Sequence, residues 1–453
     1  MPGESEDRKN PSLYEGPVLG QIVRLALPVF LGMISQVLYT ITDTIWISRI
    51  DMNDPSLVGG VGITFPLFML VVAFGSGILI GTSSLVARSK GAGDRFVLTR
   101  VTESGFAVAL SITVPLVVLL YLYDESILTA LGARGDYLTN AGEYLRFMIP
   151  AGALMLLGNV FNGILMGEGH MKQVMAAVII ATVSNICLDP LFIFRLGMGV
   201  RGAGAATILS QLIASVYILS FFTKGRTSVA VRWRPRHVTL SVMRRIVAVG
   251  FPQIAGQMSV SAGYLVFNRI VSGLDPQALT AFAICTRFDQ VLLIPILSIG
   301  TALITMIGQN YGRGNYARIR VIWRAGLILA ICTVAFLATT IFFAAPLLYR
   351  FFSDVDAVVR YAVSQTRVVE FSFIPVAAAV LARSSFQALD RPVPGLVINV
   401  MRSIGIGVPV SLLLVLVFDF GIPGVWLGIA AGNGITAVVS LLWMRKTLYR
   451  VLS

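Results

Sequence analysis

The chain has 453 residues, of which 56% are hydrophobic and only 13% are charged, and its mean hydropathy is +0.83. A soluble domain carries roughly 25% charged residues, so this composition excludes an ordinary soluble protein and indicates a polytopic all-α membrane protein. The apolar runs are too long and too continuous for a membrane β-barrel. The net charge of +13 comes from basic residues spread over short loops, so nucleic-acid binding is not expected.

A window of about 20 residues, the length of a helix that crosses a bilayer, predicts twelve membrane spans. They are 20–48, 57–86, 101–122, 141–166, 173–194, 202–223, 247–271, 277–307, 325–350, 361–388, 395–418 and 422–443. Pro28 in the first span removes a backbone donor, which gives that helix a bending point. The three cysteines and two histidines are scattered and make no metal or catalytic motif, so no cofactor is expected.

Basic residues gather in every second predicted loop. Arg88, Lys90 and Arg95 follow the second span, seven lysines and arginines lie between 224 and 245, and Arg445 follows the last span. By the positive-inside rule, both termini are expected on the cytoplasmic side of the cytoplasmic (inner) membrane.

The two halves of the chain are similar to each other. The segment around Pro28 overlays the segment around Pro252, residues 90–95 overlay 311–316, and residues 199–211 overlay 421–433. Both copies start on the same predicted side of the membrane, which indicates parallel repeats of six spans. The expected domains are a cytoplasmic tail (1–19), an N-lobe (20–223), a basic connector (224–246), a C-lobe (247–444) and a second tail (445–453).

Two carboxylates lie inside apolar runs of the first half, Asp43 in the first span and Asp189 in the fifth. A charge in hydrocarbon costs several kcal/mol or so, and such residues usually serve a function. Tyr39 and Asp43 are four residues apart, as are Asn185 and Asp189, so each pair shares one helix face, and Gln36 lies one turn before Tyr39. Two such faces in contact would make an oxygen-rich cluster, which binds a hard cation or holds a proton between acids.

The second half lacks this cluster. When the repeats are overlaid, Phe267 stands opposite Asp43, Val408 near Asp189 and Ile404 near Asn185. This asymmetry predicts an ion site in one half only. The alternative is that the polar groups join neighbouring helices structurally.

Taken in order, several stretches resemble the multidrug and toxic compound extrusion (MATE) family. They are LPVFLGMISQVLYTITDTIWIS at 27–48, the GAGDR and GQNYGRGN loops, and NGILMGEGHMK, NICLDPLFIF and GMGVRGAGAAT across spans four to six. The resemblance covers nearly the whole chain. It implies twelve helices in two lobes arranged as a V, and export of organic, often cationic drugs by alternating access, driven by inward H⁺ or Na⁺.

Within that family, the chain is similar to the DinF-type branch more than to the NorM type. NorM-like members carry acids in spans seven and ten, whereas here GQMSVSAGYLVFNRIV in span seven has none. The DinF-type branch implies a cation site in the first lobe. The matching positions are Gln36, Tyr39, Asp43, Asn185, Asp189 and Thr207, with Asn159 or Asn162 as an addition, and Na⁺ would be held at Asp43, Asn185 and Asp189.

Other intramembrane residues have a less definite interpretation. Five charged residues of the second half could line a functional site, although structural pairing is the preferred interpretation: Arg269, Arg287, Asp289, Glu370 and Arg383. Met33, Met155 and Met258 are candidates for contact with substrate, because methionine adapts to many shapes. Ordinary core packing is nevertheless the preferred interpretation for each of them.

Three alternative functions follow from the same composition. A flippase for a lipid-linked precursor would require a strongly cationic cavity, whereas the basic residues here lie mostly in loops. A membrane-embedded enzyme would require a catalytic motif, and a scaffold would not explain the repeat or the one-sided acids. The expected protein is a monomeric carrier and not an enzyme, with small organic substrates and membrane lipid as its partners.

Overall fold

The computed structural model describes residues 13–51, 54–229 and 235–452, and in these ranges it contains helices and no β-strand. The chain forms two compact units. Unit 1 contains Leu27–Gly250, and unit 2 contains Leu13–Ala26 together with the chain from Phe251 onward. Both divisions fall inside a helix, one residue before Pro28 or Pro252, where the missing proline N–H interrupts the helical hydrogen bonds.

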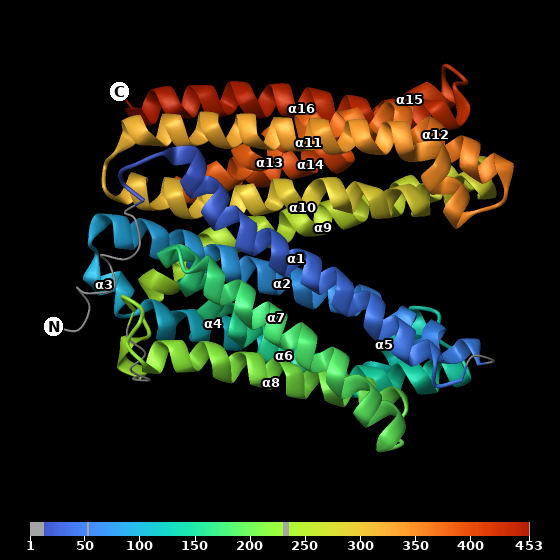
Figure 1. Cartoon of the computed structure of the whole chain (residues 1–453), viewed down its shortest axis with the longest axis horizontal. Helices are drawn as coiled ribbons and strands as arrows, with labels where there is room; N and C mark the ends of the chain where they lie inside the picture. The colour runs from blue at the N-terminus through green and yellow to red at the C-terminus, as the bar shows by residue number, and fades with distance from the viewer. Residues whose placement is uncertain (1–12, 52–53, 230–234, 453) are drawn as a thin grey trace. The chain divides into compact units, whose positions relative to one another are not determined.

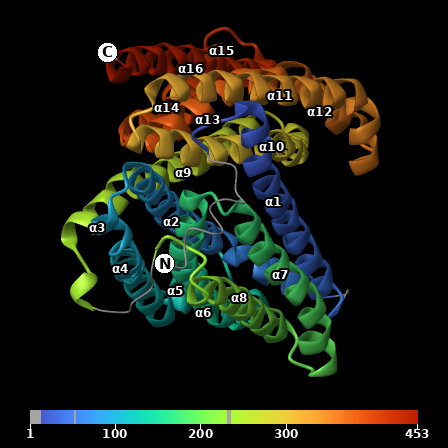
Figure 2. The ribbon, with the colours of Figure 1, turned by 60° about the vertical axis from the view of Figure 1, so that its left-hand side comes forward.

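Unit 1 is a bundle of long helices joined by short connections (Figure 1). Its elements are α1 (Val18–Ser48, from Leu27), α2 (Pro55–Ala92), α3 (Arg95–Leu98), α4 (Val101–Leu122), α5 (Asp124–Ala130), α6 (Asp136–Glu168), α7 (Met171–Pro190), the π-helix η1 (Leu191–Arg195), α8 (Val200–Thr223) and the 3₁₀-helix η2 (Pro235–His237), followed by the start of α9 (Leu240–Leu274). Figure 2 shows α4 and α8 on either side of α6, and α6 contacts both.

Glycines allow α2 and α6 to lie close together along much of their length. A Cβ at Gly163 would stand 2.7 Å from the Leu79 carbonyl oxygen, and one at Gly167 would stand 2.6 Å from the Ser83 carbonyl oxygen. Small residues at such contacts are typical of helix packing in membranes. Because lipid is itself apolar, helices there associate through van der Waals packing and not through the hydrophobic effect.

Unit 2 contains the first turns of α1, most of α9 and the helices that follow it. These are α10 (Pro276–Gly312), α11 (Tyr316–Phe352), α12 (Asp356–Val369), the 3₁₀-helix η3 (Glu370–Ser372), α13 (Phe373–Ala388), α14 (Val393–Val400), the π-helix η4 (Met401–Ile406), α15 (Gly407–Leu416) and α16 (Gly421–Leu452). Within the unit, α10 packs against α11, α12 and α13, and α13 also contacts α16.

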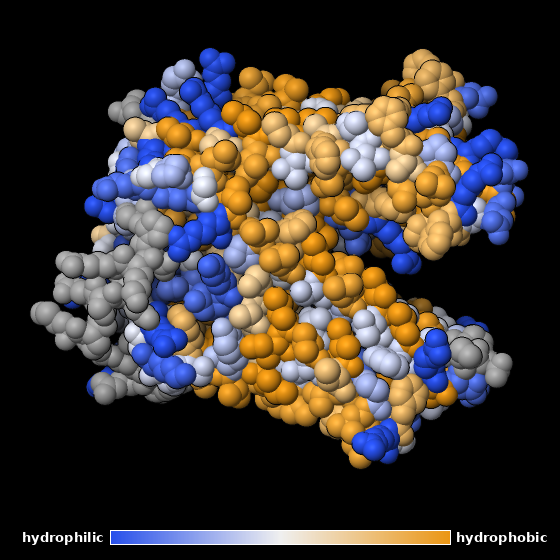
Figure 3. Space-filling view, in the orientation of Figure 1, coloured by the Kyte–Doolittle hydropathy of each residue, from blue (hydrophilic) through white to orange (hydrophobic). Residues whose placement is uncertain are grey.

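Eleven helices of the described residues are long and apolar enough to cross a membrane. The twelfth predicted span, 247–271, lies in α9, a continuous helix that is not among the eleven. Its polar residues explain the difference, since Gln253, Gln257 and Arg269 lower the hydropathy of this segment. In each unit, hydrophobic side chains cover the middle of the helices and hydrophilic ones gather at their ends (Figure 3).

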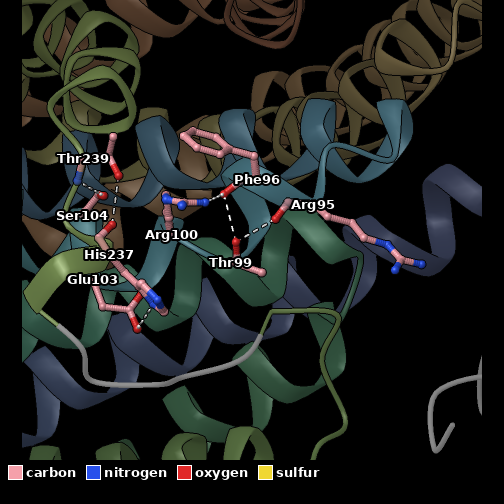
Figure 4. A network of polar contacts seen from close by, with 8 residues as sticks. All are labelled: Arg95, Phe96, Thr99, Arg100, Glu103, Ser104, His237 and Thr239. Atoms are coloured by element: carbon pink, nitrogen blue, oxygen red, sulfur yellow. Dashed lines mark hydrogen bonds and ion pairs between the residues drawn. The ribbon is translucent and has the colours of Figure 1, made fainter.

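The end of the basic connector is attached to the start of α4. The Thr239 backbone N–H donates to the Ser104 hydroxyl at 3.1 Å, and His237 Nδ1 lies 3.9 Å from a carboxylate oxygen of Glu103. Figure 4 shows these side chains together, with the Arg100 guanidinium packed over the Phe96 ring at 3.9 Å. The part of the connector at 230–234 lies outside the described residues.

Arg318 and neighbouring residues hold the segment that precedes α1 within unit 2. Arg318 on α11 donates to the carbonyl oxygens of Leu13 and Gly16, at 3.2 and 3.0 Å, and to Gln21 Oε1 at 2.9 Å. Asn310 also donates to the Leu13 carbonyl at 3.2 Å. Charge-assisted hydrogen bonds of this kind are stronger than neutral ones, so this contact fixes where α1 begins.

Candidate functional site

Asp43 lies on α1 and is 7% exposed within unit 1. Its Oδ2 accepts a hydrogen bond from the Tyr144 hydroxyl on α6 at 3.3 Å. Its Oδ1 has no hydrogen-bond partner among the described residues. The carboxylate is therefore removed from solvent with one of its two oxygens unsatisfied, which is costly for an ionised group.

A second set of polar groups joins α1, α7 and α8. Asn185 and Asp189 on α7 are fully buried, and Asn185 Nδ2 donates to Asp189 Oδ1 at 3.2 Å and to Thr207 Oγ1 at 3.4 Å. The Tyr39 hydroxyl on α1 lies 3.4 Å from the same Thr207 oxygen. Together with Asp43 and Tyr144, these residues form what we call the unit 1 cluster.

The sequence of α8 brings Thr207 to this place. A Cβ at Gly202 would stand 2.7 Å from the Phe192 carbonyl carbon of η1, and one at Gly204 would stand 2.4 Å from Phe147 Cβ of α6. Only glycine allows approaches this close. The GVRGAGAAT segment thus lets α8 approach both neighbours, so that the Thr207 hydroxyl reaches α1 and α7.

Asp189 stands where α7 stops being a regular α-helix. Pro190 follows it directly, and the chain continues as the π-helix η1. Proline removes one backbone donor, and short π-helical segments occur frequently at functional sites. Asp189 itself is buried, whereas of the irregular segment that follows only Ile193 is buried.

Apolar side chains close the cluster off from its surroundings. Tyr144 packs with the buried side chains of Ile47, Ile193 and Val200. Trp46 joins them and contacts Phe194 edge to face, with ring centroids 6.0 Å apart. Electrostatic interactions are stronger in such surroundings than in water. The carboxylates of Asp43 and Asp189 therefore repel each other when both are ionised.

The structure leaves some predicted site residues outside the hydrogen bonds of the cluster. The Gln36 side chain on α1 is exposed. Asn159 and Asn162 on α6 are half-buried and donate to none of the cluster residues described here. Met155 packs against the apolar core of unit 1, Met33 is half-buried, and Met258 is 50% exposed.

No residue spacing in the sequence could identify Tyr144 as part of the cluster. It stands near the start of the fourth predicted span, and its partner Asp43 is 101 positions away. The available indication was a tyrosine inside an apolar span, which needs a polar partner when it is buried.

The second-half counterparts are apolar in the structure as well. Phe267 and Val408 are buried, and Ile404 is 36% exposed. The charged residues of that half fall into two sets. Asp289 and Glu370 are buried at 4% and 1% exposure and Arg383 is half-buried, whereas Arg269 and Arg287 are exposed and do not join them.

The chemistry of the unit 1 cluster follows from its unfilled acceptors. Among the described residues, Asp43 Oδ1, Asp189 Oδ2 and Asn185 Oδ1 are buried without a hydrogen-bond donor. The Tyr39–Thr207 contact at 3.4 Å is longer than the usual O–H···O distance of about 2.7–2.8 Å. The two bonds that Asn185 donates, at 3.2 and 3.4 Å, are longer than the usual N–H···O distance of about 2.9–3.0 Å. A proton shared between the carboxylates, or a small hard cation, would satisfy these oxygens.

The comparisons with known proteins agree on one family. The MatE family model matches residues 28–191 and 252–413. A probable multidrug resistance protein NorM of Thermotoga maritima is 24% identical over 93% of this chain and 91% of its own. The multidrug export protein MepA of Staphylococcus aureus is 23% identical over 96% of both chains. A transporter of the MOP superfamily from Pyrococcus furiosus superposes with a TM-score of 0.91 at 28% identity, over 97% of this chain and 98% of that one.

Proposed function

Because this chain belongs to the MatE family and has the fold of its transporters, we propose that it is a multidrug exporter driven by the inward flow of H⁺ or Na⁺. The protein is a carrier in a membrane and not an enzyme. The proposed substrates are organic compounds, cationic or amphipathic, as the relatives named for multidrug export suggest.

One observation carries the coupling: two carboxylates stand buried in unit 1, and the positions equivalent to them in unit 2 are apolar. Asp43 and Asp189 interact electrostatically, and each has an oxygen without a donor among the described residues. Two like charges in a medium of low dielectric repel, so a cation that binds between them removes an energetic cost. This arrangement favours the DinF-type branch, in which the ion site belongs to the first lobe.

The proposed mechanism bends α1. Neutralising Asp43 removes its repulsion from Asp189 and lets α1 approach α7, and Pro28 provides the bending point between the two parts of α1. Closure would shrink a substrate cavity within unit 1 and expel the substrate. The ion can shift this equilibrium by no more than its difference in affinity for the two conformations. The protein would work as a monomer in the cytoplasmic membrane with both termini inside.

Proteoliposomes test the proposal with each ion separately. An outward-directed flux of a fluorescent organic cation such as ethidium should follow an imposed pH gradient or an imposed Na⁺ gradient, and the effective gradient names the ion. Asp43→Asn should abolish uphill export, and Asp189→Asn should lower it. Asp136→Asn, on an exposed position at the start of α6, is the matched control and should export like the wild type.

Uphill export at the wild-type rate by the Asp43→Asn protein would refute the proposed ion site. Thermal unfolding of each variant in the same lipid distinguishes loss of coupling from loss of folding. Spin labels on α1 and α7 add an independent readout. A distribution of label-to-label distances that stays the same when pH and Na⁺ are changed would contradict the bending step.

A further inference from the structure

Unit 2 contains a cavity with about 540 Å³ of empty space, part of which is open to solvent. It lies where the internal repeat places the counterpart of the unit 1 cluster. Four of its lining residues stand at cluster or predicted-site positions of the repeat: Val260 for Gln36, Gly263 for Tyr39, Phe267 for Asp43 and Ile429 for Thr207. The polar groups of unit 1 are thus replaced by apolar or small residues, and Gly263 lets α9 lie close to η4, since a Cβ there would stand 2.9 Å from Ser403 Cβ.

Different polar groups enter this cavity from other helices. Asp289 comes from α10, Gln365 from α12, Arg402 from η4 and Asn433 from α16. Gln365 is 1% exposed, and neither its Nε2 nor its Oε1 has a partner among the described residues. Asp289 is 4% exposed, and its Oδ1 also lacks a donor there. Buried polar groups without partners are costly in a native protein, and a ligand that binds them would remove that cost.

Aromatic side chains make much of the remaining wall. Phe267, Phe282 and Phe373 line the cavity, and Phe282 stacks on the buried Trp426 with ring centroids 5.7 Å apart and an interplanar angle of 19°. Trp426 thus holds the Phe282 ring in place. Apolar walls with a few convergent polar groups are typical of sites for organic ligands.

The charges decide what kind of organic ligand fits. Arg402 and Asp289 are electrostatic neighbours that line the same cavity. The guanidinium opposes the binding of a simple cation and offers a planar pair of donors to a carboxylate. The Asp289 carboxylate offers the opposite complement, a place for an ammonium or iminium group. Arg402 belongs to the π-helix η4, an irregular segment of the kind that functional sites frequently use.

We propose that this unit 2 cavity binds an organic zwitterion with an aromatic body, with its carboxylate on Arg402, its cationic group on Asp289 and its ring among the phenylalanines. Gln365 supplies both a donor and an acceptor to the bound molecule. The repeat has therefore diverged into an ion site in unit 1 and an organic-ligand site in unit 2. That the ligand is exported cargo rests on the proposed function, whereas the binding itself does not.

A matched pair of dyes tests the charge requirement. Tetramethylrhodamine with a free carboxyl group is a zwitterion, and its methyl ester keeps the same ring system and positive charge without the carboxylate. Fluorescence anisotropy with the full-length protein in lipid nanodiscs gives the Kd of each. The wild type should bind the zwitterion more tightly than the ester, and Arg402→Gln should reduce that preference about tenfold or more, the loss expected for a charge-assisted hydrogen bond.

The remaining variants locate the effect. Arg402→Lys keeps the charge and should restore part of the preference. Asp289→Asn should weaken both dyes, because both carry the cationic group. Arg269→Gln removes an exposed arginine of the same unit and should change neither Kd.

Equal affinities of the two dyes for the wild type would overturn the proposal, as would an unchanged preference in Arg402→Gln. Tighter binding of the ester, lost in Asp289→Asn, would make the cavity a cation site instead. Asp43→Asn should bind both dyes normally even though it fails in ion-driven export, so failure of this inference and failure of the proposed function give different results.

Discussion

Gly202→Ala should disrupt the hydrogen bonds of the unit 1 cluster, although it changes none of the polar residues of that cluster. The new Cβ would stand 2.7 Å from the Phe192 carbonyl carbon, where ordinary van der Waals contact begins at 3.4 Å. The neighbour is backbone and cannot rotate away, so α8 has to move from η1. The Asn185–Thr207 hydrogen bond is already long at 3.4 Å, so a displacement of α8 would break it. We expect a loss of about 1–3 kcal/mol in the free energy of unfolding, the usual cost of overpacking.

The matched control is Gly158→Ala, in α6 of the same unit. A Cβ there meets nothing within 4 Å, so the substitution should be neutral or should stabilise by about 0.5–1 kcal/mol, the helical cost of a glycine. Thermal unfolding and gradient-driven export in the same lipid would measure both effects. If Gly202→Ala unfolds and exports like Gly158→Ala, the close approach of α8 to η1 does not position Thr207, and the reasoning is wrong.

Two further predictions concern regions outside the two sites. Arg318→Gln should release the segment that begins at Leu13, because one residue supplies several of its hydrogen bonds. The backbone amides of this segment should then exchange hydrogen about tenfold faster for each 1.4 kcal/mol lost from the free energy of its local opening. Arg320 is an exposed neighbour, so Arg320→Gln should leave the exchange rates unchanged. Asp275 accepts from the Tyr361 hydroxyl at 2.8 Å and from a helix N-terminal N–H, and these bonds hold the pKa of its carboxyl below the usual value. Its contribution is complete above the ordinary pKa and is lost as pH falls, so the stability difference between wild type and Asp275→Asn should shrink on acidification and persist at neutral pH.

Much of the fold could be predicted from the sequence because membrane helices are long apolar runs. The family and the helical class are confirmed by the family match and by the solved relatives. The i,i+4 spacing of Asn185 and Asp189 predicted a shared face, and the two side chains are hydrogen-bonded at 3.2 Å. Local geometry of this kind depends on one helix alone, so spacing is sufficient to find it. Whether these residues bind an ion stays a prediction.

Contacts between helices were harder to predict. Tyr144 faces Asp43 because α6 is rotated by its packing against α2 and α8, which no short pattern in the sequence records. No pattern in the sequence indicated Arg402, for a related reason. It is a single arginine in an apolar span, and its neighbours in the cavity come from helices that are distant in sequence. The overlay of the repeats nevertheless indicated that the second half differs here, since Gly263 and Phe267 stand at the positions of Tyr39 and Asp43.

The proposed ion site in unit 1 and the proposed organic-ligand site in unit 2 would drive export only if the two were coupled. Helix α1, like α9, belongs partly to each unit. Its residues up to Ala26 belong to unit 2, where Arg318 binds the preceding segment, and its residues from Leu27 belong to unit 1 and carry Asp43. Pro28 stands at that division, so α1 can bend there when its unit 1 part moves at the proposed ion site. The coupling free energy is bounded by the ion's differential affinity, typically about 1–3 kcal/mol, and a weakened anchor at Arg318 should reduce it while leaving ion binding and ligand binding in place.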